Sequence, residues 1–264
     1  MNVVKAHAYG NEFLLIAAED APAPERRSAL TRSLCDRHRG VGADGVIFYR
    51  PAADGAAMDL VNADGSYSEV SGNGVRCLAA LMAQRRNVLP GGSLAIETDA
   101  GRKRLDLLSV EGARLTFRAA MGRPEDVNRR TIVLEAGTVE AVTLRVGNPQ
   151  CVVLGEVSHE RLHSIAGPLA VHPSFPAGTN VELAAVESPE RVRILIWERG
   201  VGPTEASGTG ACAAAVAAIA YGGAERDVQV VAPGGTQRVE WREDGLYLTG
   251  WAEVVFEGRW RGGP

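Results

Sequence analysis

The sequence predicts a mixed α/β protein that is built from two similar halves. The motif Glu-x-Ser-Gly-x-Gly occurs twice, as EVSGNG at 69–74 and as EASGTG at 205–210. A stretch with helical periodicity follows each copy, and short apolar runs typical of strands recur on both sides of it. Together these observations predict two pseudo-symmetric halves, each a strand-rich sheet wrapped around one central helix.

The repeat extends beyond this motif. Ser71 and Ser207 are 136 residues apart, and the same offset relates Asn62 to Glu198. GAD at 42–44 matches GTN at 178–180, and Gly-Asn at 10–11 matches Gly-Asn at 147–148 with an offset of 137. Matches that keep one order and nearly one offset indicate an internal duplication. We therefore expect an N-terminal half at 1–118 and a C-terminal half at 119–264, with a tail at about 252–264 that packs back on the first half.

The expected elements follow in chain order. Runs with β-branched or apolar character, bounded by Gly, Asp or Pro, predict strands. In the first half they are 14–18, 45–49, 57–62, 93–100 and 113–119, and in the second 131–136, 141–146, 151–155, 181–186, 192–198, 228–232 and 245–258. Helical periodicity predicts helices over 23–38, 75–88 and 211–223. The last of these is apolar on nearly every face, which is typical of a buried helix.

Composition narrows the possible functions. The net charge is −4 with acidic and basic residues interspersed, so the chain has no basic stripe for nucleic acid. No apolar run is long enough to span a bilayer, and the first residues have no signal-peptide core. The four cysteines form no Cys-x-x-Cys pair, and no histidine spacing suggests a metal site. We expect a cytoplasmic protein that binds no metal, membrane or nucleic acid.

Each Ser-Gly-x-Gly turn lies where the chain enters a predicted buried helix. Ser71 and Ser207 are candidate N-cap residues. The N–H groups that follow have no partner inside the helix, and with the helix dipole they form a site for an anion. A single such turn is most simply a capped helix, whereas two turns at a fixed repeat offset suggest a shared ligand.

Polar residues at strand ends could complete such a site. Asn11, Asn62, Asn148 and Asn180 lie close to glycines, where an asparagine is most often a turn former. Arg199 follows an apolar run and precedes a glycine loop, so its guanidinium could grip a carboxylate with two hydrogen bonds. Glu198 beside it could hold an ammonium group, although the two could also form a surface ion pair. The set suits a small zwitterion better than a large apolar ligand.

At this point the sequence resembles the diaminopimelate epimerase family. The resemblance rests on six blocks that cover nearly the whole chain: KAHAYGNEFLLI, DRHRGVGADGVIF, NADGSYSEVSGNGVRC, GNPQCVV, GTNVE and WERGVGPTEASGTGACAAA. It implies two pseudo-symmetric α/β halves, each a strand barrel around a central helix, with the active site in the cleft between them. It also implies inversion of an amino-acid α-carbon without a cofactor, by two cysteines that act from opposite faces. Members of the family are often dimers, so a homodimer is an expectation too.

The resemblance implies a set of substrate-binding residues by position. They are Asn11, Asn62, Gly72, Asn73, Asn148, Asn180, Glu198, Arg199, Gly208 and Thr209. In this reading the two helix N-termini hold the α-carboxylate and stabilise the carbanion. Arg199 and the asparagines hold the distal carboxylate, and Glu198 lies near the amine.

The chain departs from the family where the chemistry takes place. Ser71 and Ser207 stand where the family has its two cysteines, and Gln150 stands where it usually has a histidine that assists the first cysteine. Pro203 and Glu205 also differ from the common residues. Changes beyond the two cysteines favour a natural divergent member over an engineered one. A serine hydroxyl is a far weaker acid than a thiol and acts only beside a strong base.

Three functions remain open from the sequence. The first is epimerisation of L,L- to meso-diaminopimelate, or of a related amino acid, in lysine biosynthesis, with Ser71, Ser207 and Glu198 as the catalytic candidates. The second is a different isomerase or lyase on the same fold, in which Glu198 is the obvious base and a serine is a donor or relay. The third is a non-catalytic protein that keeps the amino-acid pocket.

Overall fold

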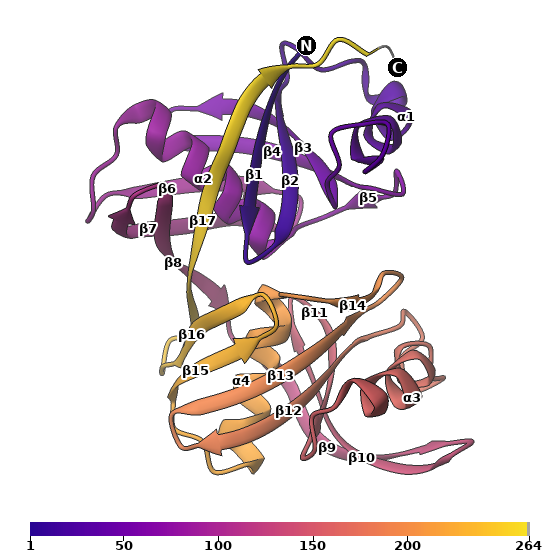
Figure 1. The fold of residues 1–264 in the computed structure, drawn as a ribbon. Coiled ribbons are helices and arrows are strands. Elements are labelled where there is room, and N and C mark those ends of the chain that lie inside the picture. Colours follow the sequence, from indigo (N-terminus) through magenta and orange to yellow (C-terminus); the bar gives the residue numbers. More distant parts are fainter. Residues whose placement is uncertain (263–264) are drawn as a thin grey trace. The chain divides into compact units, whose positions relative to one another are not determined.

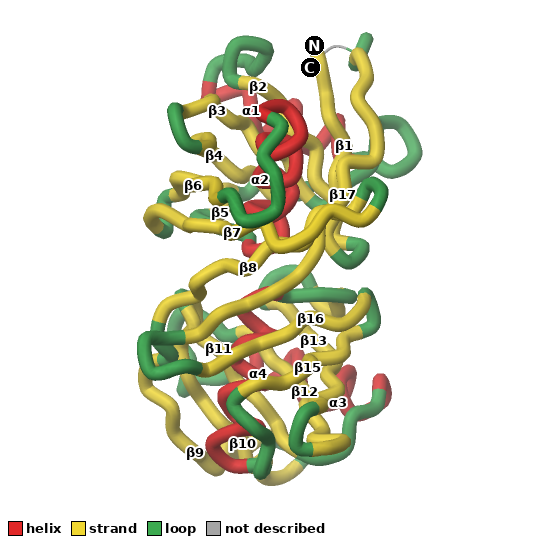
Figure 2. The backbone as a smooth tube through the Cα atoms, turned by 90° about the vertical axis from the view of Figure 1, so that its left-hand side faces the viewer, coloured by secondary structure: helices red, strands yellow, loops and turns green. Residues whose placement is uncertain are grey.

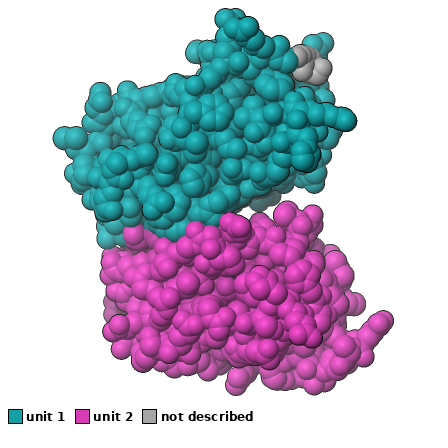
Figure 3. Space-filling view, viewed as in Figure 1, with its two compact units in different colours: residues 1–119, 250–264 teal, residues 120–249 magenta. Residues whose placement is uncertain are grey.

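The computed structural model describes residues 1–262, and the chain divides into two compact units (Figure 3). Unit 1 contains Met1–Ala119 together with the C-terminal residues from Gly250 on. Unit 2 is the continuous segment Ala120–Thr249. Each unit has its own set of strands, apart from one shared last strand, and its own central helix (Figure 1).

Unit 1 is a closed ring of strands. They pair in the order β1–β2–β3–β4–β6–β7–β8–β17, and β17 pairs again with β1 (Figures 1 and 2). Their bounds are β1 Asn2–Ala8, β2 Asn11–Ala17, β3 Gly45–Ala52, β4 Gly55–Asn62, β6 Ser93–Thr98, β7 Gly101–Glu111, β8 Arg114–Gly122 and β17 Leu246–Arg259. A short strand, β5 (Tyr67–Ser68), pairs with β4 beside the ring. Every strand of the ring has a neighbour on both sides, so the backbone N–H and C=O groups of the ring find partners within it.

Unit 2 repeats this order of pairing. Its strands follow one another as β9–β10–β11–β12–β13–β15–β16–β17. Their bounds are β9 Glu125–Leu134, β10 Gly137–Val146, β11 Asn148–Leu154, β12 Asn180–Ser188, β13 Arg191–Glu198, β15 Asp227–Ala232 and β16 Gly235–Trp241, and β14 (Gly202–Thr204) pairs with β13. The parallel pairs also coincide, since β2–β3 and β4–β6 correspond to β11–β12 and β13–β15. The predicted pseudo-symmetry of the two halves is confirmed.

One buried helix fills each unit. Helix α2 (Gly72–Arg86) contacts β1, β2, β4, β6 and β7, and helix α4 (Gly208–Tyr221) contacts β10 to β13, β15 and β16. Residues 211–218 of α4 are almost completely buried and are mostly alanine. Small side chains let the surrounding strands approach the helix closely, and alanine has the highest helix propensity. The predicted central helices are confirmed, and their first turns begin at the two Ser-Gly-x-Gly motifs.

Two outer helices cover the sheets from outside. Helix α1 (Pro24–Cys35) packs on β3 and β4, as its periodicity predicts. Helix α3 (His159–Ala170) packs on β9, β12 and β13 through Leu162, Ala166 and Leu169, and the sequence analysis missed it. It contains Pro168 next to Gly167, and these residues interrupt a helical pattern in the sequence. Pro168 lies in the last turn, where it removes one intrahelical hydrogen bond, and the helix ends two residues later at Ala170.

The two ends of the chain meet within unit 1. Strand β17 pairs antiparallel with β1, from Asn2 opposite Arg259 to His7 opposite Glu253. The Trp260 N–H then donates to the Met1 carbonyl at 2.9 Å. The first strand of the chain is therefore held in place by the last.

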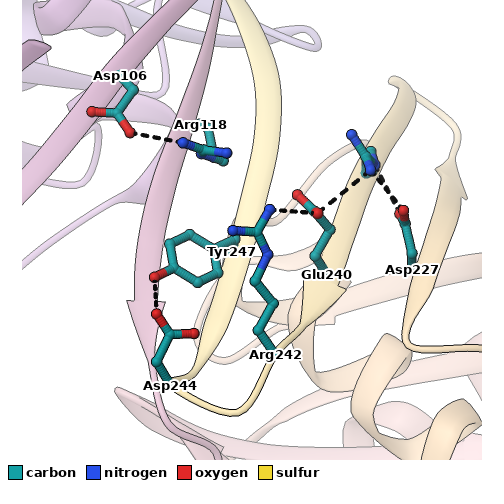
Figure 4. Close-up of polar contacts among 8 residues, drawn as sticks. Asp106, Arg118, Asp227, Glu240, Arg242, Asp244 and Tyr247 are labelled. Carbon is teal, nitrogen blue, oxygen red and sulfur yellow. Dashed lines mark hydrogen bonds and ion pairs between the residues drawn. The ribbon is translucent and has the colours of Figure 1, made fainter.

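Several ion pairs lie near β15 to β17 (Figure 4). Arg238 donates to both carboxylate oxygens of Asp227, at 2.7 and 2.6 Å, and Arg242 donates to Glu240 at 2.7 Å. In unit 1, Arg118 donates to Asp106 at 3.2 Å. Exposed pairs of this kind contribute about 0–1 kcal/mol each, and none of them includes a predicted site residue. No helix within residues 1–262 has the length and apolar character needed to cross a bilayer.

Candidate active site

The first candidate half-site is the N-terminus of α2 in unit 1. Ser71 has extended backbone angles, and its Oγ accepts a hydrogen bond from the Gly74 N–H at 3.1 Å. This is the N-cap geometry that the sequence predicts. Gly72 and Asn73 form the first turn, whose remaining N–H groups carry the positive end of the helix dipole.

The second candidate half-site is the N-terminus of α4 in unit 2, and it has the same geometry. Ser207 is also extended, and its Oγ accepts from the Gly210 N–H at 3.2 Å. Ser207 is only 4% exposed, Gly208 is buried and Thr209 is half-buried. The hydroxyl hydrogen of each serine is left for another acceptor, because Oγ uses a lone pair in the cap.

A chain of polar contacts holds the first half-site. Asp44 accepts from the Asn11 side chain at 2.8 Å, and Asn11 in turn accepts from the Asn73 side chain at 3.1 Å. Asn73 also accepts from Arg76, which is buried in α2. Two of the predicted ligands, Asn11 and Asn73, thus lie together with fixed amide orientations. Asp44 and Arg76 were not among the predicted site residues, although the spacing of three between Asn73 and Arg76 places them on one face of a helix.

Asn62 makes a local contact instead. Its side-chain amide donates to Ser66 Oγ at 3.0 Å, within the turn after β4. It stands opposite Gly45 of β3. An asparagine near a glycine is most often a turn former, and the contact of Asn62 with Ser66 is of this kind.

The second half-site has its own polar set around β12 and β13. Asn180 Oδ1 accepts from the Arg199 backbone N–H at 3.0 Å, and the Arg199 guanidinium donates to the carbonyl of Ala177. Arg199 is exposed, so its side chain is available to a ligand as well. Asn148 Oδ1 accepts from the Gln150 side chain at 2.6 Å. Gln150, at the position of the family's histidine, is completely buried and orients Asn148.

A second acidic residue, which the sequence analysis missed, accompanies Glu198. Glu182 of β12 is completely buried, and among residues 1–262 neither of its carboxyl oxygens has a hydrogen-bond partner. Burial raises the pKa of Glu182 well above its usual range, and the nearby Glu198 carboxylate raises that pKa further. Burial without hydrogen-bond partners thus favours the protonated form of Glu182, whereas Glu198 is half-buried at the end of β13.

The native cysteines do not provide an alternative pair of nucleophiles. All four are buried, and burial raises the pKa of Cys35, Cys77 and Cys151 to about 12. A cysteine with such a pKa remains a thiol at neutral pH and is inert. The N-cap positions of α2 and α4 hold serine instead.

Unit 2 also contains a pocket of about 320 Å³. Arg130, Arg145, Gln150 and the segment from Ser174 to Gly178 line it. None of the predicted site residues lines this pocket, although Gln150 and Gly178 lie two residues from Asn148 and Asn180 in the sequence. The candidate site therefore lies at the helix N-termini and not at this pocket.

Comparison with known sequences identifies one family. The family model described as diaminopimelate epimerase matches residues 3–127 and 142–255. The diaminopimelate epimerase of Desulforudis audaxviator is 42% identical over 278 residues, which cover 98% of this chain and 99% of that protein. The chloroplastic diaminopimelate epimerase of Oryza sativa subsp. japonica is 37% identical over 281 residues, covering 98% of this chain and 79% of that protein.

Comparison with solved structures gives the same fold at low sequence identity. A predicted epimerase from Pseudomonas aeruginosa superposes with a TM-score of 0.78 at 14% identity, covering 99% of both chains. A probable proline racemase from Agrobacterium radiobacter, solved with bound carbonate, gives a TM-score of 0.73 at 17% identity, covering 98% of this chain and 92% of that one. At such identities the likeness describes the fold alone.

Proposed function

Because the chain belongs to the diaminopimelate epimerase family, we propose that it is an isomerase that converts L,L-diaminopimelate to the meso form by inversion at one α-carbon. This reaction belongs to lysine biosynthesis and, as proposed, uses no cofactor. The observation that supports it best is the pair of capped helix N-termini, one in each unit, at equivalent places in the repeat.

The proposed roles follow from the chemistry of each group. The N–H groups at Gly72-Asn73 and at Gly208-Thr209 bind the α-carboxylate, because helix N-termini favour anions. The same groups stabilise the negative charge that spreads onto this carboxylate when the α-proton leaves. Arg199, with Asn11, Asn62, Asn148 and Asn180, binds the distal carboxylate, and Glu198 lies near the amine. Ser71 and Ser207 flank the α-carbon.

Serine at both proton-transfer positions sets the expected rate. A serine hydroxyl must be paired with a base before it can accept a proton from carbon. We therefore propose a slow epimerase, with Glu198 as an additional acid–base group. Proton transfer by a well-placed group contributes about 10²–10⁴-fold to a rate, so the loss of two thiols is large enough to measure.

The resemblance also leads us to propose that the protein works in the cytoplasm as a homodimer. Sedimentation equilibrium of the purified chain, over a range of protein concentrations, tests the second part. A single species with the mass of one chain would contradict the dimer and would leave the proposed reaction unaffected.

The test of the proposed reaction is NMR of L,L-diaminopimelate in D₂O, in which loss of the α-proton signal reports exchange. The wild-type chain and the variant Ser71→Cys/Ser207→Cys are compared at equal concentration. We expect slow exchange by the wild type and much faster exchange by the double variant. Exchange by the double variant alone would show a pocket without a catalyst, as in a non-catalytic binder. A product with a different constitution would show another isomerase or a lyase, and no exchange by either chain would show a different substrate.

A further inference from the structure

The interiors of the two units differ beneath the two Ser-Gly-x-Gly turns. The strands that pair in parallel beside these turns are β2 with β3 in unit 1 and β11 with β12 in unit 2. In this register Leu15 pairs with Ile47, and Val152 pairs with Glu182. Across the next strand, Ile47 pairs with Leu60 and Glu182 with Ile196. Ile47 and Glu182 therefore occupy equivalent places, one apolar and the other a carboxyl.

The same contrast recurs two residue pairs earlier in these strands. Phe13 pairs with Gly45 in unit 1, and Gln150 pairs with Asn180 in unit 2. Phe13 and Ile47 are both buried, which is the ordinary content of a barrel interior. Gln150 and Glu182 are completely buried too, and Gln150 Oε1 as well as both Glu182 oxygens lack a hydrogen-bond partner among residues 1–262. Buried polar atoms without partners destabilise a fold, so their presence at these two positions of unit 2, where unit 1 has apolar side chains, suggests a function.

Glu182 points at the first turn of α4. A methyl group placed on Gly210 would lie 2.7 Å from Glu182 Oε1 and 3.2 Å from Ser207 Oγ. In unit 1, a methyl group on the equivalent Gly74 would meet Ile47 Cδ1 at 3.0 Å and Ser71 Cβ at 3.3 Å. Because residue 210 is a glycine, no side chain lies between the carboxyl of Glu182 and the hydroxyl of Ser207. A side chain at 210 would fill the space that separates these two groups.

We propose that Glu182 is the proton store of Ser207, an acid–base partner in the second half-site for which the first half-site has no equivalent. This inference rests on the proposed function. When the carbanion is protonated, the Ser207 O–H bond breaks and its proton joins the carbanion electron pair in a new Cα–H bond. The Glu182 carboxyl proton passes at the same time to Ser207 Oγ, which leaves a carboxylate. In the reverse direction Ser207 Oγ takes the α-proton while its own proton passes to the Glu182 carboxylate.

Glu182 is a positioning residue in this scheme, since it acts on the substrate through Ser207. The titratable groups that face it are Glu198 on β13 and Cys151 on β11. The Cys151 pKa is raised to about 12 by burial first and by Glu182 second, so this thiol stays neutral and does not compete for the proton. Ser71 has Ile47 and Phe13 beneath it, and neither can store a proton.

The test compares α-proton exchange of L,L-diaminopimelate in wild type, Glu182→Gln and the control Gln237→Leu. Glutamine keeps the size of the side chain and cannot give up a proton in this way. Gln237 is also buried in unit 2 with an unpartnered oxygen, and lies on β16 outside the site. We expect Glu182→Gln to slow exchange by about 10²-fold and to remove the pH dependence of exchange that Glu182 causes, with substrate affinity within about twofold of wild type. Gln237→Leu should keep the wild-type rate and pH profile.

The outcomes separate the two proposals. If wild type exchanges and Glu182→Gln exchanges equally well with the same pH profile, the proton store is wrong and the epimerase stands. If wild type shows no exchange, both are wrong. Should Glu182→Gln fail to fold, Gly210→Ala takes its place, because its methyl group separates Glu182 from Ser207. Exchange by folded Gly210→Ala at the wild-type rate would overturn the inference, and a similar loss of about 10²-fold would support it.

Discussion

The side-chain amide of Asn73 donates to the side-chain oxygen of Asn11 at 3.1 Å, which joins the first turn of α2 to the beginning of β2. Both amides are fixed at their other ends, because Asn11 donates to Asp44 and Asn73 accepts from Arg76. Neither amide can turn over without losing two hydrogen bonds. Asn11 and Asn73, which are far apart in the sequence, thus form one fixed polar edge beside Ser71.

Removal of Asp44 should loosen this edge. Asp44 accepts from Asn11 at 2.8 Å and from the Glu12 N–H at 2.9 Å, and its side chain is 40% exposed. Water can replace part of the lost contact, so Asp44→Ala should cost about 1 kcal/mol of substrate binding, or roughly fivefold in affinity. Isothermal titration with L,L-diaminopimelate measures this loss.

A matched control is Asp54→Ala in the same unit. Asp54 pairs with Arg102 at the surface, and its side chain is 58% exposed. Its loss should leave affinity unchanged. Equal affinities for Asp44→Ala and wild type would argue against Asn11 as a ligand.

The two N-cap serines should contribute to stability apart from any chemistry. Ser71→Ala and Ser207→Ala should each lower the free energy of unfolding by about 1 kcal/mol, as loss of an N-cap usually does. The cost should be larger at Ser207, because the cap there is buried and water cannot satisfy the Gly210 N–H. Urea unfolding of each variant measures these values.

Ser158 gives the comparison for the capping effect. It caps α3 by accepting from the Arg161 N–H at 3.3 Å, away from the predicted site residues. Ser158→Ala should show a similar stability loss with unchanged α-proton exchange. If Ser71→Ala and Ser207→Ala also kept wild-type exchange, the serines would be caps and nothing more.

Arg199 should decide whether the ligand has a second carboxylate. Its guanidinium already donates to the Ala177 carbonyl, so the side chain is held in place before a ligand arrives. Arg199→Ala should abolish measurable binding of a dicarboxylic substrate, and Arg199→Lys should restore it only in part because lysine lacks the planar fork. Titration with L,L-diaminopimelate and with L-lysine, which lacks the distal carboxylate, separates the two cases. Unchanged affinity of Arg199→Ala for diaminopimelate would refute the assignment.

The native thiols should be unreactive in the folded protein. Burial raises the pKa of Cys35, Cys77 and Cys151 to about 12, so almost no thiolate forms below about pH 9, and reaction requires the thiolate. Iodoacetamide at about pH 8 should therefore modify the folded wild type far more slowly than the unfolded chain. Mass spectrometry of the labelled protein counts the modified sites.

The variant Ser71→Cys/Ser207→Cys provides the contrast in that experiment. A thiol at a helix N-terminus has a lowered pKa, so the new cysteine at the half-exposed position 71 should be labelled first. Rapid labelling of Cys77 or Cys212 in the wild type would mean that the central helices open readily.

The pH dependence of stability reports the protonation of Glu182 directly. A carboxyl that is buried and neutral in the folded state keeps its proton when the unfolded chain has released its own. Between the ordinary glutamate pKa and the raised value, the folded state binds more protons, so the free energy of unfolding falls as pH rises. As pH rises from the ordinary glutamate pKa towards the raised value, wild type should lose stability relative to Glu182→Gln. A constant difference across this range would show that the carboxyl is not neutral in the folded protein.

The sequence predicted the architecture because the duplicated features are local. An Ser-Gly-x-Gly turn before an alanine-rich run indicates a capped, buried helix wherever the rest of the chain lies. Strand β9 was predicted only at its end, 131–134, because its first residues are exposed and polar and have no alternating pattern. Helix α3 was not predicted, because Gly167 and Pro168 are unfavourable inside a helix. Only the structure shows that these two residues lie in its last turn.

The site was predictable only in part. The capping roles of Ser71 and Ser207 follow from local sequence, whereas the contact between Asn11 and Asn73 depends on how β2 approaches α2. Glu182 lies in the run VELAAV, where alternation would place it on a solvated face opposite Val181 and Leu183. In this unit both faces of β12 are covered, by α3 on one side and α4 on the other, so an acidic residue in the run is buried.

Unit 1 is made of two separate segments of the chain, and this affects the order in which the protein folds during synthesis. The ribosome makes residues 1–119 first, yet the ring of unit 1 closes only when residues 250–259 of β17 arrive between β1 and β8. Until then β1 and β8 are open sheet edges, which can pair with other chains. Unit 2 is one continuous segment, so most of its strands can pair before the last strand of unit 1 has been synthesised. The nascent chain is thus most exposed to aggregation in its earliest residues, and translation stopped before Gly250 leaves that half without its closing strand.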